Sequence, residues 1–481
     1  MEQIINYING KLIQSNSNEY LNVEDPSIGK FFIKVPDSNI EDLSLAVKSA
    51  KNSFHTWSSL SIEDRSKYLH NIADYIQDNI NAFAEAESLD TGKPISLAKN
   101  LDIPRAISNF RFFADYAKNF EFNFSLNSEN STNLINQYPL GVVACISPWN
   151  LPLYLFSWKI APALITGNTV VAKPSELTPL TAYMLSKACM ETDLPNGVLN
   201  IIHGRGSNIG KLLINHPDIK AISFTGGTET GKKIAQETAG TFKKLSLEMG
   251  GKNASIIFND CNYDKMIDTT IKSSFSNQGQ ICLCTSRLLI ESSIYERFKT
   301  DLIIRTKNLI IGDPKKNETQ FGAISSKQHF EKIMTYIKTA KQQGGKIITG
   351  GNPILLNGRC KNGYFIEPTI IESLDNDSII NQDEIFGPVI TLQRFDSEKD
   401  AIVLANNSNY GLSATIWSNN DEKANRVASK IDAGVIWINC WLVRDLRTPF
   451  GGIKQSGLGR EGGSYALDFF TETKNICRSL N

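Results

Sequence analysis

The 481-residue sequence lacks an excess of charge of either sign, because 50 Lys and Arg residues balance 50 Asp and Glu residues. Basic residues occur in pairs at most, and no longer basic tract is present. Proteins that bind nucleic acids or anionic membranes usually carry a basic patch. We therefore expect neither a nucleic acid nor a membrane surface as a partner.

A long uninterrupted hydrophobic run is also absent. The most apolar region, residues 139–171, contains five interruptions: Pro148, Pro152, Lys159, Pro162 and Gly167. A transmembrane helix needs about 18 or more consecutive apolar residues. The region is therefore predicted to form a buried strand, a loop and a core helix.

Neither a disulfide framework nor a metal-binding motif is recognisable. The eight cysteines have no regular spacing: Cys145, Cys189, Cys261, Cys282, Cys284, Cys360, Cys440 and Cys477. The five histidines are scattered, and no His or Cys pair has the spacing of a structural zinc site. The first six residues include an early acid and no apolar segment, which indicates neither secretion nor organelle import. We expect reduced thiols, no metal and a cytoplasmic location.

The chain is long enough for two or three domains. Between residues 140 and 259, short β-branched runs alternate with helical patterns. The predicted strands are 141–147, 169–172, 199–202, 221–225 and 254–258. This alternation predicts an open, Rossmann-like parallel sheet of the α/β class, and a second α/β block follows residue 260. Before this region, helices are expected over about 39–57, 62–86 and 102–119, and residues 120–135 form a hairpin or a loop.

The segment Phe275–Arg287 contains the most reactive candidate, Cys282. It follows the Gly279-Gln280 turn, where a cysteine can be partly exposed with backbone N–H groups near its sulfur. Such donors favour the thiolate, which is the nucleophilic form. The alternative is that Cys282, like most cysteines, is inert packing.

Two glycine-rich turns are candidates for holding phosphates. Gly204–Gly210 and Gly226–Gly231 each connect a predicted strand to a helix, and a helix N-terminus offers free N–H groups to an anion. Each turn alone is a weak signal, since tight strand–helix turns also need glycine. Two in successive crossovers of one sheet favour a dinucleotide site.

Three further polar groups follow predicted strands. Glu176 in Lys173-Pro-Ser-Glu176 can accept hydrogen bonds from ribose hydroxyls and would repel a 2′-phosphate; equally, it is a helix N-terminal acid. Glu248 ends an apolar run, so its raised pKa would suit a general base; its alternative is a turn acid paired with Lys252. Asn150 is either a turn residue or an oxyanion donor.

Seven motifs occur in one order over nearly the whole chain: Pro148-Trp-Asn150, Lys173-Pro-Ser-Glu176, Phe224-Thr-Gly-Gly-Thr-Glu-Thr-Gly231, Leu247-Glu-Met-Gly-Gly-Lys252, Asn277-Gln-Gly-Gln-Ile-Cys282, Glu384-Ile-Phe-Gly-Pro388 and Pro449-Phe-Gly-Gly-Ile-Lys-Gln-Ser-Gly457. In order and spacing they resemble the aldehyde dehydrogenase superfamily. The resemblance implies NAD-dependent oxidation of an aldehyde to a carboxylic acid. It makes Cys282 the nucleophile, Asn150 an oxyanion donor and Glu248 the general base, and it assigns Cys284 no catalytic role.

The resemblance also implies which residues contact NAD. They are Pro148, Trp149, Lys173, Ser175, Glu176, Gly206, Phe224, Thr225, Gly226, Gly227, Gly231, Met249, Glu384 and Phe386. Lys173 and Glu176 would hold the adenosine ribose, and Glu384 the nicotinamide ribose. Gly227 departs from the family pattern, where many members have Ser, which removes one hydroxyl contact. Glu176 favours NAD over NADP.

Two segments indicate which class of aldehyde is the substrate. Those around Arg105 and Arg444 are similar to the corresponding segments of 2-aminomuconate and 2-hydroxymuconate semialdehyde dehydrogenases. By this likeness Arg105 and Arg444 grip a substrate carboxylate, which suits the planar guanidinium fork. Arg111 and Arg447 are equally available, and any of the four arginines can instead form a structural ion pair.

The resemblance implies a division of the chain. Residues 1–119 and 138–249 would bind the dinucleotide, 250–432 would form the catalytic domain, and 433–462 would line the substrate tunnel. Residues 120–137 and 463–481 would form an arm that builds a homodimer or homotetramer. Three alternatives remain: a betaine-aldehyde or general small-aldehyde dehydrogenase, a non-catalytic relative of the fold, and a cysteine hydrolase, for which no histidine motif is recognisable.

Overall fold

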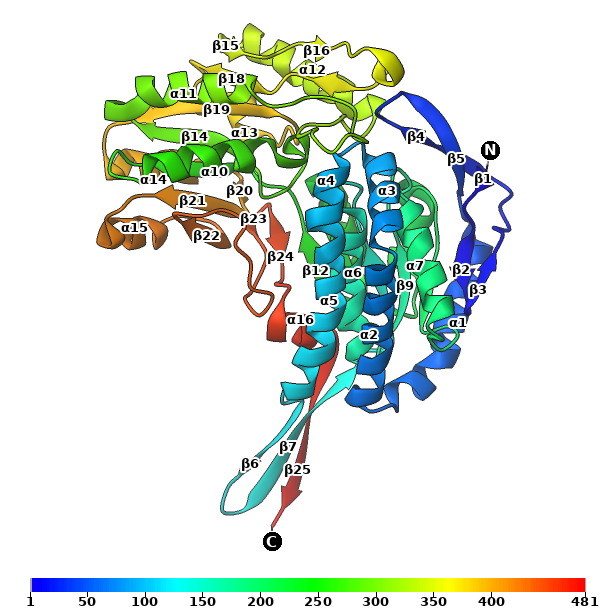
Figure 1. Ribbon diagram of the computed structural model, residues 1–481. Helices are drawn as coiled ribbons and strands as arrows, with labels where there is room; N and C mark the ends of the chain where they lie inside the picture. Colours follow the sequence, from blue (N-terminus) through cyan, green and yellow to red (C-terminus); the bar gives the residue numbers. More distant parts are fainter. Residues whose placement is uncertain (1, 481) are drawn as a thin grey trace.

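The computed structural model describes residues 2–480 and contains two large sheets and a projecting arm (Figure 1). The first sheet has the order β24-β12-β11-β8-β9-β10-β2-β3. Its strands are β2 Asn6–Ile8, β3 Lys11–Ile13, β8 Val142–Ile146, β9 Thr169–Lys173, β10 Leu199–Ile201, β11 Ile219–Thr225, β12 Lys244–Glu248 and β24 Gly457–Leu458. Strands β8 to β12 pair in parallel, which confirms the predicted Rossmann-like sheet. The strand order reverses between β8 and β11, where α/β folds bind ligands.

Helices before and between these strands pack on the sheet. They are α1 Ile40–Ser58, α2 Ile62–Asp78, α3 Ile80–Thr91, α4 Ile95–Leu97, η1 Ala98–Asp102, α5 Ile103–Tyr116, η2 Ala117–Asn119, α6 Pro152–Ile165, α7 Leu180–Glu191, η3 Gly206–Gly210, α8 Lys211–Asn215, α9 Thr228–Thr238 and η4 Ala239–Thr241. The apolar region 139–171 forms β8, α6 and β9, and all residues of these elements are buried. It is therefore core, as the sequence predicted.

One helix prediction is wrong. The helix expected over about 62–86 is two helices, because Asn79 leaves the helical conformation at φ −106° and ψ 20°. Its side-chain amide donates to the Tyr75 carbonyl at 2.8 Å and so satisfies a carbonyl at the end of α2. The predicted start of α2 is confirmed, since the Ser61 hydroxyl accepts from the Asp64 N–H at 3.1 Å.

The second sheet has the order β15-β18-β19-β14-β13-β21-β22 and is parallel except for β15. Its strands are β13 Asn253–Ile257, β14 Thr285–Glu291, β15 Lys346–Thr349, β18 Thr369–Glu372, β19 Val389–Phe395, β21 Ser413–Trp417 and β22 Val435–Ile438. The accompanying helices are α10 Tyr263–Phe275, η5 Ser276–Gly279, η6 Ser292–Ile294, α11 Tyr295–Lys307, α12 Lys327–Gln342, η7 Gly358–Cys360, α13 Ile379–Gln382, α14 Glu398–Asn406 and α15 Asp421–Ala428. The last helix, α16 Gly463–Phe469, packs instead on α6 beside the first sheet. The predicted second α/β block is confirmed.

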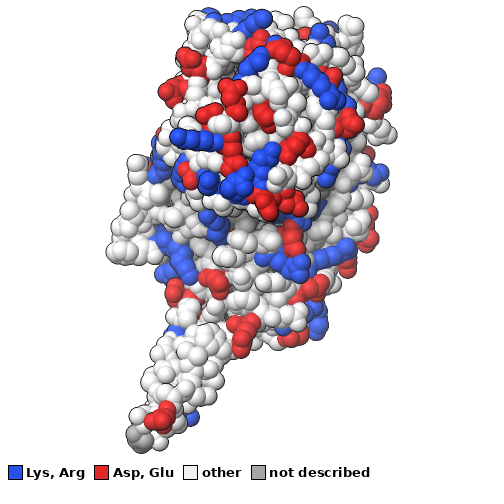
Figure 2. Space-filling model, turned by 90° about the vertical axis from the view of Figure 1, so that its left-hand side faces the viewer, with Lys and Arg blue, Asp and Glu red and all other residues white. Residues whose placement is uncertain are grey.

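The arm is a three-stranded antiparallel sheet of β6 Asn123–Asn127, β7 Ser131–Pro139 and β25 Thr471–Ser479. Residues 120–135 therefore belong to a hairpin and not to a loop. The arm projects from the body, with the C-terminus at its tip (Figure 1). Figure 2 shows acidic and basic side chains mixed over the body, whereas the visible face of the arm is mostly uncharged. Apolar side chains of the arm face solvent: Phe124, Leu126, Leu134 and Ile476.

Smaller sheets complete the fold. Strands β1 Glu2–Gln3, β4 Tyr20–Asp25 and β5 Lys30–Pro36 form one, β16 Pro353–Ile354 and β17 Phe365–Ile366 a second, and β20 Tyr410–Gly411 and β23 Ile453–Lys454 a third. Among residues 2–480, no helix combines the length and apolar character that crossing a bilayer requires.

Candidate active site

The candidate site lies where the C-terminal ends of β8, β11 and β12 meet the segment before β14. Cys282 lies in that segment, just after η5. Asn277 and Gln278 adopt left-handed backbone conformations with φ of 50° and 56°, which turn the chain sharply ahead of the cysteine. The Asn253 side-chain amide donates to the Cys282 and Cys284 carbonyls at 2.7 and 2.9 Å. The Asn253 side chain therefore fixes the backbone of the cysteine segment on both sides of Leu283.

Cys282 lines two cavities. The first, of about 200 Å³, is bounded by the ends of β8 and β11 and by the Glu384 segment; its lining includes Asn150, Gly226 and Glu384. The second, of about 30 Å³, lies on the other side of the thiol and is lined by Glu248, among others. The amide, the thiol and the carboxylate predicted to cooperate therefore lie around one junction between two cavities.

The Asn150 side chain is buried and oriented by its neighbours. Its amide nitrogen donates to the Gln280 carbonyl at 2.9 Å. An amide nitrogen carries two N–H bonds, so one remains for an oxyanion. The main-chain carbonyl of Asn150 accepts from Lys93 Nζ at 3.0 Å and from Asn277 Nδ2 at 3.2 Å.

Glu248 ends β12 with both carboxylate oxygens buried and without a hydrogen-bond partner among the described residues. Burial raises its pKa well above the usual range, the nearby Glu461 carboxylate adds to the rise, and Lys159 opposes it. Lys252 Nζ is also without a partner, so the alternative of a Glu248–Lys252 turn pair is wrong. A buried carboxyl with a raised pKa can act as a proton acceptor near neutral pH.

The thiol of Cys282 is not poised as expected. Burial raises its pKa, and the carboxylates of Glu384 and Glu248 raise it further. The backbone N–H of Cys282 favours the thiolate, as expected, but burial and the two carboxylates outweigh it. The thiol must lose its proton before it can attack.

The first cavity has the features of a dinucleotide site. A Cβ atom added at Gly206 or Gly227 would meet nothing within 4 Å, so the backbone at these helix starts faces open space. At Gly250 an added Cβ would lie 2.0 Å from the Glu384 carboxylate, and at Gly231 it would lie 2.1 Å from Met249 Sδ. Gly231 and Gly250 are thus required because a side chain there would clash with a neighbour. Gly206 and Gly227 leave room at helix starts where a phosphate would approach.

The side chains expected to hold the riboses come from two places: Lys173 and Glu176 lie at and after the end of β9, and Glu384 lies in the segment before β19. Lys173 Nζ donates to Glu176 at 3.3 Å, and the Gly251 N–H donates to Glu384 at 3.0 Å. Burial raises the pKa of Glu384 to about 6. The Phe386 ring packs edge-on against Trp149 with 5.3 Å between ring centroids. The residues present therefore fit a nicotinamide dinucleotide.

Two arginines line the second cavity. Arg105 and Arg444 both lie over the Tyr154 ring, at 5.5 and 5.4 Å from its centroid, and Arg444 also stacks on Trp158 at 4.1 Å. The Nη2 atom of Arg444 is buried without a partner. Burial lowers the pKa of Arg444 to about 9, and the like charge of Arg105 contributes to this shift. A bound anion would relieve both effects.

The other two arginines are engaged elsewhere. Arg111 forms an ion pair with Asp74 at 2.7 Å, and Arg447 forms one with Asp445 at 2.5 Å. The side chains of these two ion pairs are each at least 42% exposed. Neither Arg111 nor Arg447 lines the second cavity.

A buried ion pair beside Glu248 was not predicted. Lys159 Nζ donates to Glu461 at 2.7 Å and to the Ser223 hydroxyl at 3.2 Å. The pair joins residues 302 positions apart, so no local pattern reveals it. Lys159 interrupts an otherwise apolar run, however, and a lysine buried in a core helix needs a partner.

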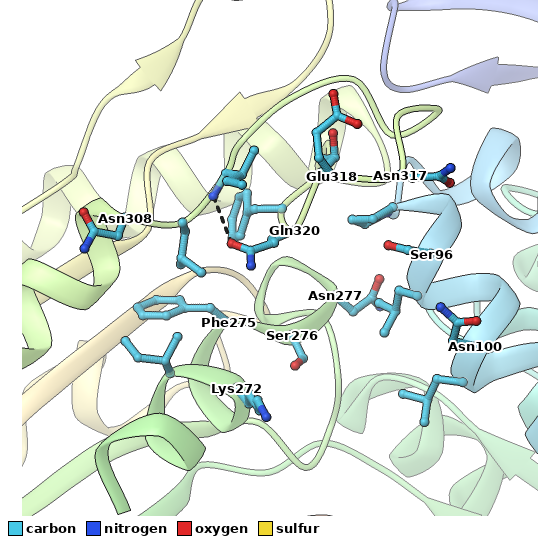
Figure 3. Close-up of a pocket in the computed structure, with 18 of the residues that line it drawn as sticks. Ser96, Asn100, Lys272, Phe275, Ser276, Asn277, Asn308, Asn317, Glu318 and Gln320 are labelled. Atoms are coloured by element: carbon cyan, nitrogen blue, oxygen red, sulfur yellow. Dashed lines mark hydrogen bonds between the residues drawn. The ribbon is translucent and has the colours of Figure 1, made fainter. Parts of the chain in front are cut away.

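A further cavity is lined in part by the segment that precedes Cys282. It is a cleft of about 910 Å³ that includes residues of α4, η1, α10 and the segment after α11. In Figure 3, Asn277 lies on the side of the cleft that carries Ser96 and Asn100. The Asn277 side chain therefore joins this wall to the carbonyl of Asn150. Within residues 2–480, no group of three or more His, Cys, Asp or Glu side chains could hold a metal ion.

A parallel sheet with glycine turns at its switch point, next to a cysteine reached from two cavities, is the arrangement expected of a dinucleotide-dependent enzyme with cysteine chemistry. Residues 12–476 match the aldehyde dehydrogenase family. The chain belongs to this family, which confirms the resemblance seen in the motifs.

Three similar proteins are informative. The chain is 45% identical to 2-aminomuconic semialdehyde dehydrogenase of Homo sapiens, with 98% of this chain and 97% of that protein covered. It is 42% identical to 2-hydroxymuconic semialdehyde dehydrogenase of Pseudomonas sp. (strain CF600), with 100% of both covered. The NAD+ complex of an aldehyde dehydrogenase from Bacillus cereus superimposes with a TM-score of 0.97 at 35% identity, covering 100% of this chain and 97% of the other. The expected fold is confirmed.

Proposed function

We propose that this protein oxidises an acidic semialdehyde, such as 2-aminomuconate or 2-hydroxymuconate semialdehyde, to the corresponding dicarboxylic acid with NAD as acceptor. The observation that carries the proposal is the pair of arginines in the cavity behind Cys282, one of them with an unpartnered guanidinium nitrogen. Two half-buried guanidinium groups of like charge around one small cavity are costly to hold together. A substrate carboxylate would neutralise them and direct the aldehyde carbon toward the sulfur.

The chemistry follows from the positions of the three side chains. Cys282, after losing its proton, attacks the aldehyde carbon to give a thiohemiacetal. The Asn150 amide and the Cys282 N–H stabilise the oxyanion. The bound dinucleotide supplies a hydride acceptor on the side of the first cavity. After hydride loss Cys282 holds a thioester, and Glu248 removes a proton from the water that releases the carboxylic acid.

NAD is supported over NADP by Glu176. Its carboxylate is held by Lys173 and would repel a 2′-phosphate. Eight further contacts proposed for NAD line the first cavity: Pro148, Trp149, Thr225, Gly226, Gly227, Met249, Glu384 and Phe386. Ser175, Gly206, Phe224 and Gly231 follow or flank the same strands.

The division into domains and the oligomer are also proposals. The two large sheets support a dinucleotide-binding part over 1–119 and 138–249, a catalytic part over 250–432 and a tunnel segment over 433–462. The arm of 120–137 and 463–481 exposes apolar side chains, which supports its use in a homodimer or homotetramer. All eight cysteines are free, which supports a reducing, cytoplasmic location.

A substrate panel with NAD and NADP tests the proposal. We expect NADH formation at 340 nm to be most efficient with acidic semialdehydes. A betaine aldehyde, being cationic, should be a poor substrate because Arg105 and Arg444 repel it. Higher kcat/KM for the cationic or uncharged aldehydes would favour the alternative small-aldehyde activity, and no turnover with any aldehyde would favour a non-catalytic relative.

A further inference from the structure

Three ionisable side chains, Lys93, Glu87 and Asp102, form a cluster that is here called the Lys93 cluster. None of the three lines either of the two cavities. Lys93 Nζ donates to Glu87 at 3.1 Å and to Asp102 at 2.5 Å, and the three side chains are exposed by 1% at most. Burial lowers the pKa of Lys93, but the carboxylates of Asp102 and Glu87 outweigh burial and the net direction is upward. Burial also raises the pKa of Glu87. The Lys93 ammonium thus lies between two buried carboxyl groups, at hydrogen-bond distance from both.

Such a cluster contributes little to stability compared with a well-packed apolar core, because desolvating three charges offsets their attraction. Its other bonds suggest what it does instead. Lys93 Nζ makes its third hydrogen bond to the main-chain carbonyl of Asn150 at 3.0 Å. The second carboxylate oxygen of Glu87 accepts from the Leu153 N–H at 3.4 Å. The cluster thus holds the loop between β8 and α6 at Asn150 and the first turn of α6 at Leu153.

The other side of the cluster reaches the arginine helix. Asp102 ends η1, a single π-helical turn, and α5 with Arg105 follows directly. Such turns are rare and are often found at functional sites. Burial lowers the pKa of Arg105, and the Asp102 carboxylate opposes the shift. One ammonium therefore connects the backbone of the oxyanion amide with the start of the helix that carries Arg105.

We propose that Lys93 is a positioning residue, which acts through Asn150 to set the amide for oxyanion binding; this inference rests on the proposed function. The Asn150 carbonyl accepts one hydrogen bond from Lys93 and one from Asn277. Asn277 also lines the cleft shown in Figure 3. Both hydrogen bonds must be present to fix the peptide plane, and with it the direction of the side chain. A shift of 1 Å in such a group can lower a rate by about 100-fold.

The test is a double-mutant cycle of Lys93→Met and Asn150→Ala, read as the burst rate of NADH formation. Met keeps the length and removes the charge. We expect Asn150→Ala to slow the burst by about 100- to 1,000-fold and Lys93→Met to slow it by at least about 10-fold, with KM for NAD unchanged. In the Asn150→Ala background, Lys93→Met should have no further effect. Equal slowing in both backgrounds would overturn the inference.

Two companion variants keep the test decisive. Removing Lys93 leaves the Glu87 and Asp102 carboxylates without their cation, which can prevent folding. In that case the double variant Lys93→Met/Asp102→Asn, which has one carboxylate fewer, replaces Lys93→Met in the cycle. Arg65→Met is the matched control, because Arg65 is a buried cation that lines neither cavity and donates at 2.9 Å to the carbonyl of Ile165, at the end of α6 opposite to Asn150; we expect a lower Tm and an unchanged burst. The cycle is run with an uncharged aldehyde as well, so that a wrong substrate class does not hide the effect of Lys93.

Discussion

Replacing Arg444 by Met should remove a buried guanidinium while keeping the stacking on Trp158 and Phe450. The wild-type guanidinium lies 4.1 Å from the Trp158 ring and 4.9 Å from the Phe450 ring, and its Nη2 atom is free for a ligand. A charge-assisted hydrogen bond contributes about 1.5–3 kcal/mol. Since 1.4 kcal/mol is tenfold, kcat/KM for an acidic semialdehyde should fall by about 10- to 150-fold. The same loss is expected for Arg105→Met.

The assay compares an acidic semialdehyde with an uncharged aldehyde of similar length. For the uncharged aldehyde we expect little loss or a gain, because one of two repelling buried charges is gone. Arg447→Met is the matched control, since its guanidinium pairs with Asp445 on the surface, and both substrates should be turned over as by the wild type. Equal losses on both substrates for Arg444→Met would refute the reasoning.

Three further predictions follow from the same geometry. Glu248→Gln should keep the NADH burst but slow steady-state turnover by about 100-fold or more, which stopped-flow absorbance checks; loss of the burst would contradict the role in deacylation. Burial raises the pKa of both Cys282 and Glu248, and each group acts in its deprotonated form. The activity should therefore increase with pH through and above neutrality, and a pH profile that falls over this range would contradict these roles. Glu176→Ser should raise the NADP-to-NAD ratio of kcat/KM by at least about 10-fold, since like charges in contact cost several kcal/mol, and an unchanged ratio would exclude Glu176 as the discriminating group.

The parallel sheet could be predicted from the sequence because its strands are buried on both faces and read as short β-branched runs between helical patterns. The division of residues 62–91 into α2 and α3 could not. It depends on one residue, Asn79, whose side chain competes for the Tyr75 carbonyl. The apolar periodicity continues across it.

The motifs placed the thiol, the amide and the carboxylate in sequence, but not the groups that support them. Lys159 and Glu461 are distant in the chain and meet only in the folded protein. Lys93 lies in the sequence Thr91-Gly-Lys-Pro94, which is typical of a turn and gives no sign of the contact with Asn150, 57 residues later. Of the four candidate arginines, Arg447 has a partner two residues away, Asp445, so a local hint existed for that one.

The reactivity of Cys282 was also beyond the sequence. Its position suggested backbone donors near the sulfur, but in the folded protein burial raises the pKa of the thiol, and Glu384 and Glu248, which are 102 and 34 residues away in the chain, raise it further. This environment disfavours the thiolate, whereas Glu248, with both oxygens free, is assigned to the later hydrolysis step.

The most direct test of the account is to trap the acyl-enzyme. Glu248→Gln is mixed with NAD and an acidic semialdehyde, quenched in acid, digested and analysed by mass spectrometry. We predict one acyl group per chain, assigned to Cys282 by fragmenting the peptide that contains both Cys282 and Cys284, with one equivalent of NADH. Acylation of Cys284 in place of Cys282, or NADH release without any acylated cysteine, would contradict the central claim.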